Sequence, residues 1–207
     1  MLDALILDYG GVVIHEDPAD YDQIGRPLGF GEGVLWAAIH SIPEYLPSRV
    51  GQLSAEQFRE AVHRYLARIA GHPAADAALE RLDDYYHPHQ PIRAVMQPLL
   101  AALKGKVRMA VLSNTTRGAT ERLERQGLSD YFDAILCSGD TGVAKPDLNA
   151  FRLAARRLAI PVERCAFVDD TLEHVVTARC LGMEALLYHH TRHKELVDAL
   201  ERWAMLG

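Results

Sequence analysis

Four apolar runs in this sequence end in polar or tight-turn residues that could carry chemistry. The residues concerned are Asp8, Ser113–Asn114, Ser138–Gly139 and Asp169–Asp170. Any one of them could simply mark the end of a strand. Three carboxylates that converge on one edge of a sheet, however, raise one another's pKa unless a cation neutralises them. We therefore expect a cation where Asp8, Asp169 and Asp170 meet.

Two cations fit this position. One is a hard divalent ion, because ligation by two carboxylates, a backbone carbonyl and water suits Mg²⁺ better than Zn²⁺. The other is Lys145, one of four lysines in a chain that otherwise uses arginine. It stands directly before a predicted helix, where a cation opposes the helix dipole. Its compact ammonium suits a carboxylate or a phosphate oxygen, so we favour a functional lysine over one that extends into solvent.

Five short apolar runs are the elements that must position these groups. They cover residues 4–7, 109–112, 134–137, 165–168 and 185–188. Each is apolar at consecutive positions, which is typical of parallel strands buried on both faces. Predicted helices at 117–126, 148–158 and 171–181 separate the last four runs, and an amphipathic helix at 191–206 follows them. This alternation predicts an α/β fold with a doubly wound, Rossmann-like parallel sheet.

The alternation is interrupted once, by a long helical segment between the first two runs. Helical spacing of apolar residues covers 57–69, after the capping signal Ser54–Gln57, and also 74–86 and 33–40. We predict a core domain of residues 1–15 and 93–207, and a helical cap domain of residues 16–92. The cap should lie over the carboxyl ends of the strands, where open α/β sheets bind ligands.

Composition excludes several classes of protein. The chain has 22 Lys and Arg residues against 28 Asp and Glu residues, and this acidic balance argues against a nucleic-acid binder. No apolar run approaches the ~20 residues that span a bilayer, and the N-terminus does not resemble a signal peptide. Cys137, Cys165 and Cys180 lie in apolar surroundings, which predicts buried free thiols in a reducing compartment. We expect a cytoplasmic protein with no membrane contact; the sequence leaves its oligomeric state open.

Four segments in order resemble the motifs of a known family. Asp8-Tyr9-Gly10-Gly11-Val12, Ser113-Asn114, Lys145-Pro146-Asp147 and Phe167-Val168-Asp169-Asp170 are similar to the four motifs of the haloacid dehalogenase (HAD) superfamily. The helical insertion resembles the C1 cap of its subfamily IA, and the segment 50–54 resembles a turn in that cap. The first motif has the variant form Asp-x-Gly-Gly-Val. Together the motifs and the cap cover essentially the whole chain.

The resemblance implies a Mg²⁺-dependent phosphatase that acts on a small phosphorylated metabolite. Asp8 would be the nucleophile that forms an aspartyl-phosphate, and Lys145 would neutralise it and the transferred group. Ser113 and the amides around Asn114 would hold phosphoryl oxygens. The implied ligands of Mg²⁺ are Asp8, the Gly10 carbonyl and Asp170. Asp169 would be a further ligand or would contact these ligands without binding the ion.

Gly10 departs from the family pattern, because most phosphatases of the family have an aspartate there as general acid and base. The loss of such a group costs about 10²–10⁴-fold in rate. His15 or His174 could replace it, since histidine titrates near neutral pH. A phosphate- or protein-binding module without turnover is the alternative function. A 2-haloacid dehalogenase is a weaker one, because family dehalogenases have tyrosine at this position and need no metal.

Overall fold

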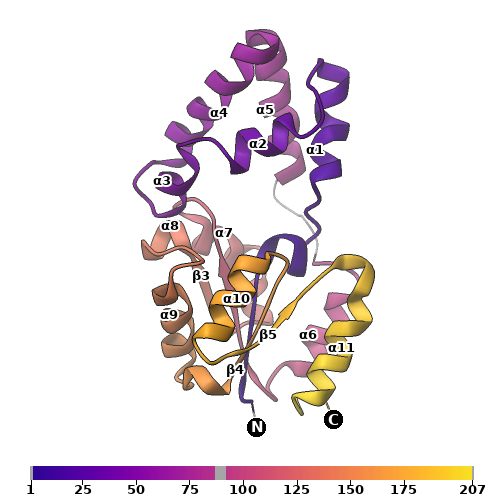
Figure 1. Cartoon of the computed structure of the whole chain (residues 1–207), viewed down its shortest axis with the longest axis vertical. Coiled ribbons are helices and arrows are strands. Elements are labelled where there is room, and N and C mark those ends of the chain that lie inside the picture. The colour runs from indigo at the N-terminus through magenta and orange to yellow at the C-terminus, as the bar shows by residue number, and fades with distance from the viewer. Residues whose placement is uncertain (1, 87–91, 207) are drawn as a thin grey trace.

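The computed structural model describes residues 2–86 and 92–206, and its core is a five-stranded parallel sheet (Figure 1). The strands lie in the order β3-β2-β1-β4-β5. Every neighbouring pair is parallel, which confirms the predicted doubly wound α/β sheet. The strands are β1 (Ala4–Leu7), β2 (Arg108–Ser113), β3 (Ala134–Cys137), β4 (Cys165–Asp169) and β5 (Glu184–Leu187).

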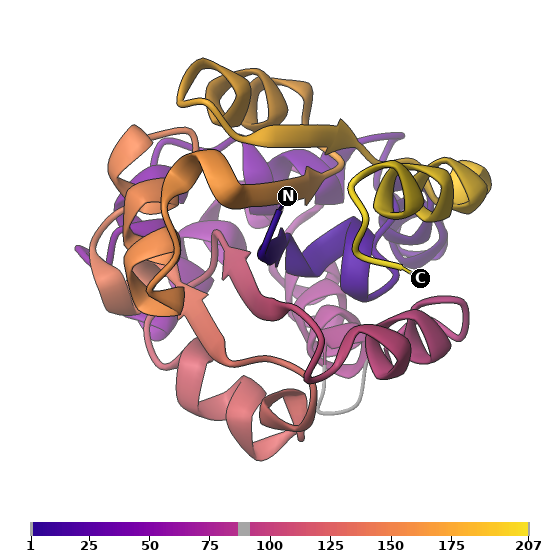
Figure 2. The ribbon, with the colours of Figure 1, turned by 90° about the horizontal axis from the view of Figure 1, so that it is seen from below.

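Helices cover both faces of the sheet (Figure 2). Successive side chains of a strand alternate between the faces, so Leu5 and Leu7 pack on one side while Ala4 and Ile6 pack on the other. The first face is covered by α6 (Met96–Leu103), α7 (Ala119–Arg125) and α11 (His193–Arg202). The second is covered by α9 (Leu148–Leu158) and α10 (Leu172–Cys180), and the short α8 (Ser138–Thr141) follows β3.

The strand order brings the ends of β1 and β4 together. β1 lies between β2 and β4, with Leu7 paired to Val168, so that Asp8 and Asp169 follow neighbouring residues. The chain leaves β1 toward β2 but returns to its other side at β4. Ligands bind at such a switch point, outside the carboxyl ends of the strands.

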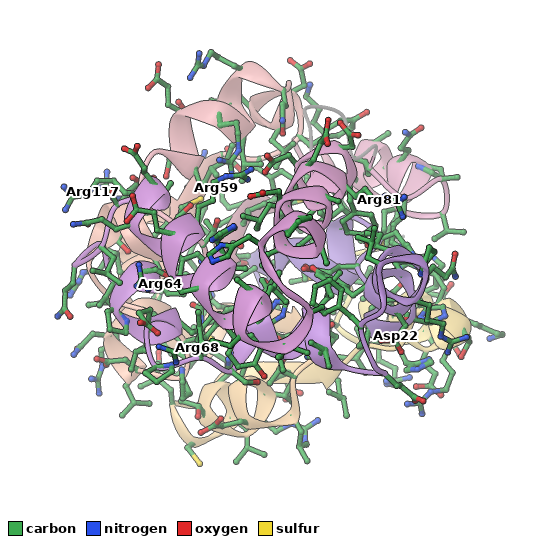
Figure 3. The ribbon with its side chains drawn as sticks, turned by 90° about the horizontal axis from the view of Figure 1, so that it is seen from above. Asp22, Arg59, Arg64, Arg68, Arg81 and Arg117 are labelled. Carbon is green, nitrogen blue, oxygen red and sulfur yellow. The ribbon has the colours of Figure 1, made fainter. Side chains whose placement is uncertain are left out.

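In the described part of the chain, five α-helices form a cap above this edge of the sheet (Figures 1 and 3). They are α1 (Pro18–Gly25), α2 (Val34–His40), α3 (Tyr45–Arg49), α4 (Ala55–Ala70) and α5 (His72–Tyr86). They enclose a hydrophobic cluster whose buried members all lie between Tyr21 and Leu82. Ser54 begins α4 with the predicted capping box, in which its hydroxyl accepts from the Gln57 amide.

Two kinds of contact join the cap to the core. The segments that enter and leave it form an antiparallel bridge between Ile14 and Ile92. On the opposite side, Arg117 donates from Nη2 to the Gly51 carbonyl over 3.0 Å, and Figure 3 shows Arg117 at the rim of the core. We propose residues 16–92 as the cap domain; the predicted cap residues 87–91 lie outside the described part.

Several local predictions were wrong. Neither α1 nor α6 was among the predicted helices; Pro18 and Pro98 stand in their first turns, where proline is tolerated. The last predicted helix, 191–206, extends only over His193–Arg202. Cys137 and Cys165 are buried as expected, but Cys180 at the end of α10 is exposed. No helix in the described ranges combines the length and apolarity needed to cross a bilayer.

Two positions on α4 test whether the cap is a cooperative unit with its own core. Leu66 is fully buried, whereas Ile69 is 48 % exposed on the same helix. We expect Leu66→Ala to lower the free energy of unfolding by about 2–5 kcal/mol through the cavity it leaves, and Ile69→Ala by less than about 0.5 kcal/mol. Hydrogen exchange should show faster exchange across α1, α2, α4 and α5 in Leu66→Ala, with β1–β5 unchanged. Equal acceleration in the sheet would contradict a separate cap.

Candidate active site

A buried lysine joins the ends of β1 and β4. The Lys145 ammonium lies 2.8 Å from Asp8 Oδ1 and 2.6 Å from Asp169 Oδ2. Lys145 is only 2 % exposed, and Asp169 is completely buried. Burial by itself lowers the pKa of Lys145, but Asp169 and Asp8 outweigh it and raise this pKa above its ordinary value. The lysine therefore carries its charge at the edge of the sheet.

The loop that carries Lys145 is held by an asparagine at the end of β2. Asn114 accepts from the Lys145 amide over 2.9 Å and donates to the Lys145 carbonyl over 2.7 Å. Asp147 then caps α9 by accepting from the Asn149 amide. Asn114, which was predicted to help bind phosphate, thus uses its side chain to position Lys145.

Asp169 is fixed on both of its oxygens. Oδ2 accepts from Lys145, and Oδ1 accepts from the Thr171 amide over 2.8 Å. The Nδ1 atom of His174 is 3.0 Å from each oxygen. Burial raises the pKa of Asp169, but Lys145 and His174 lower it more, to about 2. This carboxylate is therefore a permanent anion that holds a lysine and a histidine in place.

Asp8 and Asp170 carry the negative charge that Lys145 leaves unbalanced. Burial raises the pKa of Asp8 well above its ordinary value, Lys145 opposes this effect, and Asp169 and Asp170 add to it. Burial raises the pKa of Asp170 to about 6, with a smaller contribution from the negative charge of Asp169. One oxygen of each of the three carboxylates lies within 4.8 Å of the others. Such a set of hard oxygen donors fits Mg²⁺.

The loop after Asp8 is shaped around these acids. The Asp8 amide donates to the Val168 carbonyl of β4 over 2.9 Å, and Asp8 Oδ1 accepts from the Tyr9 amide over 2.7 Å. Gly11 has a positive φ of 69°, and a Cβ there would overlap Oδ2 of Asp170. Glycine is therefore required at this position, both by the backbone and by the approach of the carboxylate.

A cavity of about 620 Å³ between cap and core opens onto this loop. Ser113, buried at the end of β2, lines it from the core. Arg49 lines it from the cap, buried between the rings of Tyr45 and Phe58 at 4.7 and 4.9 Å from their centroids. Its Nε is a buried nitrogen without a hydrogen-bond partner among the described residues. Other lining residues are Tyr9, Gly10, Glu16, His40, Thr115 and Thr116.

The structure separates the sequence candidates into those near this cavity and those elsewhere. Ser138 and Gly139 do not join the carboxylates; Ser138 Oγ accepts from the Thr115 amide and so supports the loop after β2. His15 is half exposed, with Nε2 2.9 Å from Asp20. Neither His15 nor His174 is among the lining residues, and the same holds for Asp8, Lys145, Asp169 and Asp170. His174 contacts Asp169 instead.

Glu16 was missed by the sequence analysis. Its carboxylate occupies the space where a side chain on Gly10 would begin. The only signal in the sequence is that position 10 lacks an acid, which suggests that another residue could supply one. No spacing rule connects positions 10 and 16, because the chain between them is irregular and its path depends on the cap.

Comparison with known proteins identifies the family. The family model described as "Hydrolase: haloacid dehalogenase-like hydrolase" matches residues 2–182. The chain belongs to this HAD-like family. Among curated relatives, it is 31 % identical over 194 residues to the drimenol cyclase drtB of Aspergillus calidoustus, covering 91 % of this chain and 34 % of that protein.

A second relative of this HAD-like chain is named a phosphatase. It is phosphatase MT3486 of Mycobacterium tuberculosis, 30 % identical over 151 residues, which cover 70 % of this chain and 60 % of that protein. The chain thus spans between a third and three fifths of the length of these two relatives.

A solved structure shares the fold. It is a HAD-family enzyme of Bacteroides thetaiotaomicron in complex with magnesium and inorganic phosphate. Its TM-score is 0.67 at 21 % sequence identity, over 90 % of this chain and 93 % of that one. At this identity the match concerns the fold of the HAD-like chain.

The buried lysine gives a stability prediction with a defined pH dependence. Lys145→Met should lower the free energy of unfolding at pH 8 by about 3–5 kcal/mol, because it leaves buried carboxylates without their partner. In wild type, the low pKa of Asp169 contributes stability that is lost as the pH falls below about 4. In the variant, the pKa of Asp169 in the folded state should instead rise above that in the unfolded state. Stability should then increase as the pH falls from 8 to 5.

Urea unfolding at several pH values measures this effect. Lys194→Met is the matched control, because Lys194 pairs with Asp198 on the surface, and we expect it to leave the unfolding curves unchanged. A Lys145→Met variant whose loss of stability is the same at pH 8 and pH 5 would contradict the electrostatic account.

Proposed function

We propose that this chain is a Mg²⁺-dependent phosphomonoesterase with Asp8 as its nucleophile, acting on a small phosphorylated molecule. The observation that carries the proposal is the meeting of Asp8, Asp170 and Lys145 beside a cavity that Gly10 and Ser113 line. A carboxylate nucleophile needs a fixed orientation and neutralising charge, and both are present. Relatives named as phosphatases support the same assignment.

The donor set supports Mg²⁺ as the cofactor. Asp8, the Gly10 carbonyl and Asp170 would hold it, while Asp169 is occupied by Lys145, His174 and the Thr171 amide. When bound, the ion would neutralise the acids and the phosphoryl oxygens. The high pKa of Asp8 and Asp170 is consistent with a site that is short of positive charge without it.

The protein's own residues would divide the work of phosphoryl transfer between positioning and charge. An Asp8 oxygen would attack phosphorus as the ester oxygen departs, and Lys145 would balance the charge on Asp8. Ser113 would donate its hydroxyl to a phosphoryl oxygen. The cap would exclude water from the cavity, which strengthens each of these interactions.

The lining of the cavity supports a substrate with an organic part of moderate size. Its volume of about 620 Å³ is within the usual range of small-molecule sites. Apolar residues of α4 and α5 (Phe58, Val62, Leu79 and Leu82) line it together with Arg49 and His40. We therefore propose that the organic part combines an apolar surface with a group that accepts hydrogen bonds from Arg49.

The nucleophile can be tested directly with aryl and alkyl phosphates in the presence of Mg²⁺. Asp8→Asn should lower kcat by on the order of 10³-fold or more, because no aspartyl-phosphate can form. Asp76→Asn, an exposed cap residue, is the control and should keep full activity. Activity that survives in Asp8→Asn would overturn the proposal. A wild-type chain that binds beryllofluoride yet hydrolyses no ester would favour the binding module instead.

The metal site can be tested without turnover. Mg²⁺ should raise the Tm of the wild-type chain, since a ligand that binds only the folded state stabilises it. Asp170→Asn should abolish this response. Without metal at pH 7.5, the Tm of the variant should be about 2–4 °C above that of wild type. This shift corresponds to about 1 kcal/mol in the free energy of unfolding, because the variant loses one partly screened repulsion between carboxylates.

The sign of this effect follows from the pKa of Asp170. Because it is raised to about 6 in the folded state, the ionised carboxylate destabilises the metal-free chain above that pH, and stability increases as the pH falls toward 4. Asp84→Asn, on the exposed face of α5, is the control. A Mg²⁺-dependent rise in Tm that is as large in Asp170→Asn as in wild type would exclude Asp170 as a ligand.

A further inference from the structure

Gly10 is a glycine for reasons of space. Its φ of −66° and ψ of 140° are accessible to any residue, so its backbone does not require glycine. A Cβ at Gly10 would instead overlap Oε2 of Glu16, and the three nearest atoms to that position all belong to the Glu16 side chain. The volume of a side chain two residues after Asp8 is therefore filled by a carboxylate from elsewhere in the chain.

Contacts from the cap orient this carboxylate. Oε1 of Glu16 accepts from the Tyr21 hydroxyl over 2.7 Å, and Nε2 of His40 is 3.8 Å from the same oxygen. Tyr21 is fully buried on α1, with its ring edge-to-face against Trp36 at 5.0 Å. One oxygen is thus held by the cap while the other lies over the loop that carries Asp8.

Glu16 also borders the space in which a substrate would bind. It lines the same cavity as Gly10 and Ser113. The other acidic lining residues are placed differently: Asp83 pairs with Arg59 at 2.5 Å, and Glu56 is exposed in the first turn of α4. Among the described acids of the cavity, Glu16 is the one in contact with the loop after Asp8.

We infer that Glu16 is the general acid and base of this enzyme, supplying from the cap-side segment the carboxyl group that position 10 lacks. This inference rests on the proposed phosphomonoesterase function. It assigns a proton-transfer role to a residue outside all four motifs.

The proton balance of the reaction follows. In the first step an Asp8 oxygen bonds to phosphorus, the bond from phosphorus to the ester oxygen breaks, and that oxygen takes the proton of the Glu16 carboxyl. The alcohol leaves and Glu16 remains as carboxylate. In the second step Glu16 removes a proton from a water molecule, whose oxygen attacks phosphorus. The bond between Asp8 and phosphorus then breaks, inorganic phosphate forms, and Glu16 is again protonated.

Leaving-group dependence tests this role with two esters of similar shape, p-nitrophenyl phosphate and phenyl phosphate. The nitrophenolate departs readily without a proton, whereas phenolate does not. In Glu16→Gln we expect kcat/KM to fall by about 10²-fold or more for phenyl phosphate but by less than about tenfold for p-nitrophenyl phosphate. Because kcat/KM reports steps up to the first irreversible one, it follows phosphoryl transfer to Asp8.

Matched variants separate chemistry from packing. Glu60→Gln makes the same charge change at an exposed position of α4 and should leave both rates unchanged. Adding Gly10→Asp to a Glu16→Ala chain should restore hydrolysis of phenyl phosphate, because the new side chain enters the space that Glu16 has left. Inhibition by inorganic phosphate and the Tm report whether each variant keeps its folded site.

The outcomes distinguish this inference from the proposed function. A wild-type chain that hydrolyses neither ester overturns the phosphomonoesterase assignment, and the role of Glu16 with it. An active wild type whose Glu16→Gln variant loses equal factors on both esters, or loses nothing, overturns the role of Glu16 alone. The selective loss with rescue by Gly10→Asp establishes it.

Discussion

The buried ammonium of Lys145 holds the carboxyl ends of β1 and β4 together, and the rest of the site is arranged around it. Two carboxyl groups from neighbouring strands cannot both be ionised at a buried edge without a cation, because the repulsion between them is strong where water is absent. Lys145 meets this need at 2.8 and 2.6 Å. A lysine buried in this way is stable only when every partner is in place. Asn114 helps to keep it there, because its side chain forms hydrogen bonds with both the amide and the carbonyl of Lys145.

This lysine balances only part of the charge, and the imbalance is what gives the site its chemistry. Lys145 and His174 hold the pKa of Asp169 below its ordinary value, whereas burial keeps the pKa of Asp8 and of Asp170 raised. The fold thus keeps a surplus of carboxylate oxygens next to a cavity, at a cost in stability. A divalent cation would reduce this repulsion, and the proposed phosphatase function gives such a cation a further role, because it would also balance the negative charge of a phosphoryl group.

The sequence predicts the sheet and the acids well because both depend on local patterns. Each strand is a short apolar run, and Asp8 and Asp169 follow directly from where such runs end. The clustering of Arg49 with Tyr45 and Phe58, and the contact of Glu16 with Gly10, could not be predicted in this way. These contacts depend on how the cap helices pack and on where the cap meets the core, and neither leaves a periodic signal.

The pairing of Gly10 with Glu16 changes what the cap can contribute. A general acid at position 10 would belong to the core loop and would be present whether or not the cap covered the site. Glu16 instead stands at the start of the cap segment, and Tyr21 of α1 holds its carboxyl. Its position against Gly10 therefore depends on the packing of the cap. On the proposed role of Glu16, proton transfer would therefore depend on the same packing of cap and core that would exclude water from the cavity.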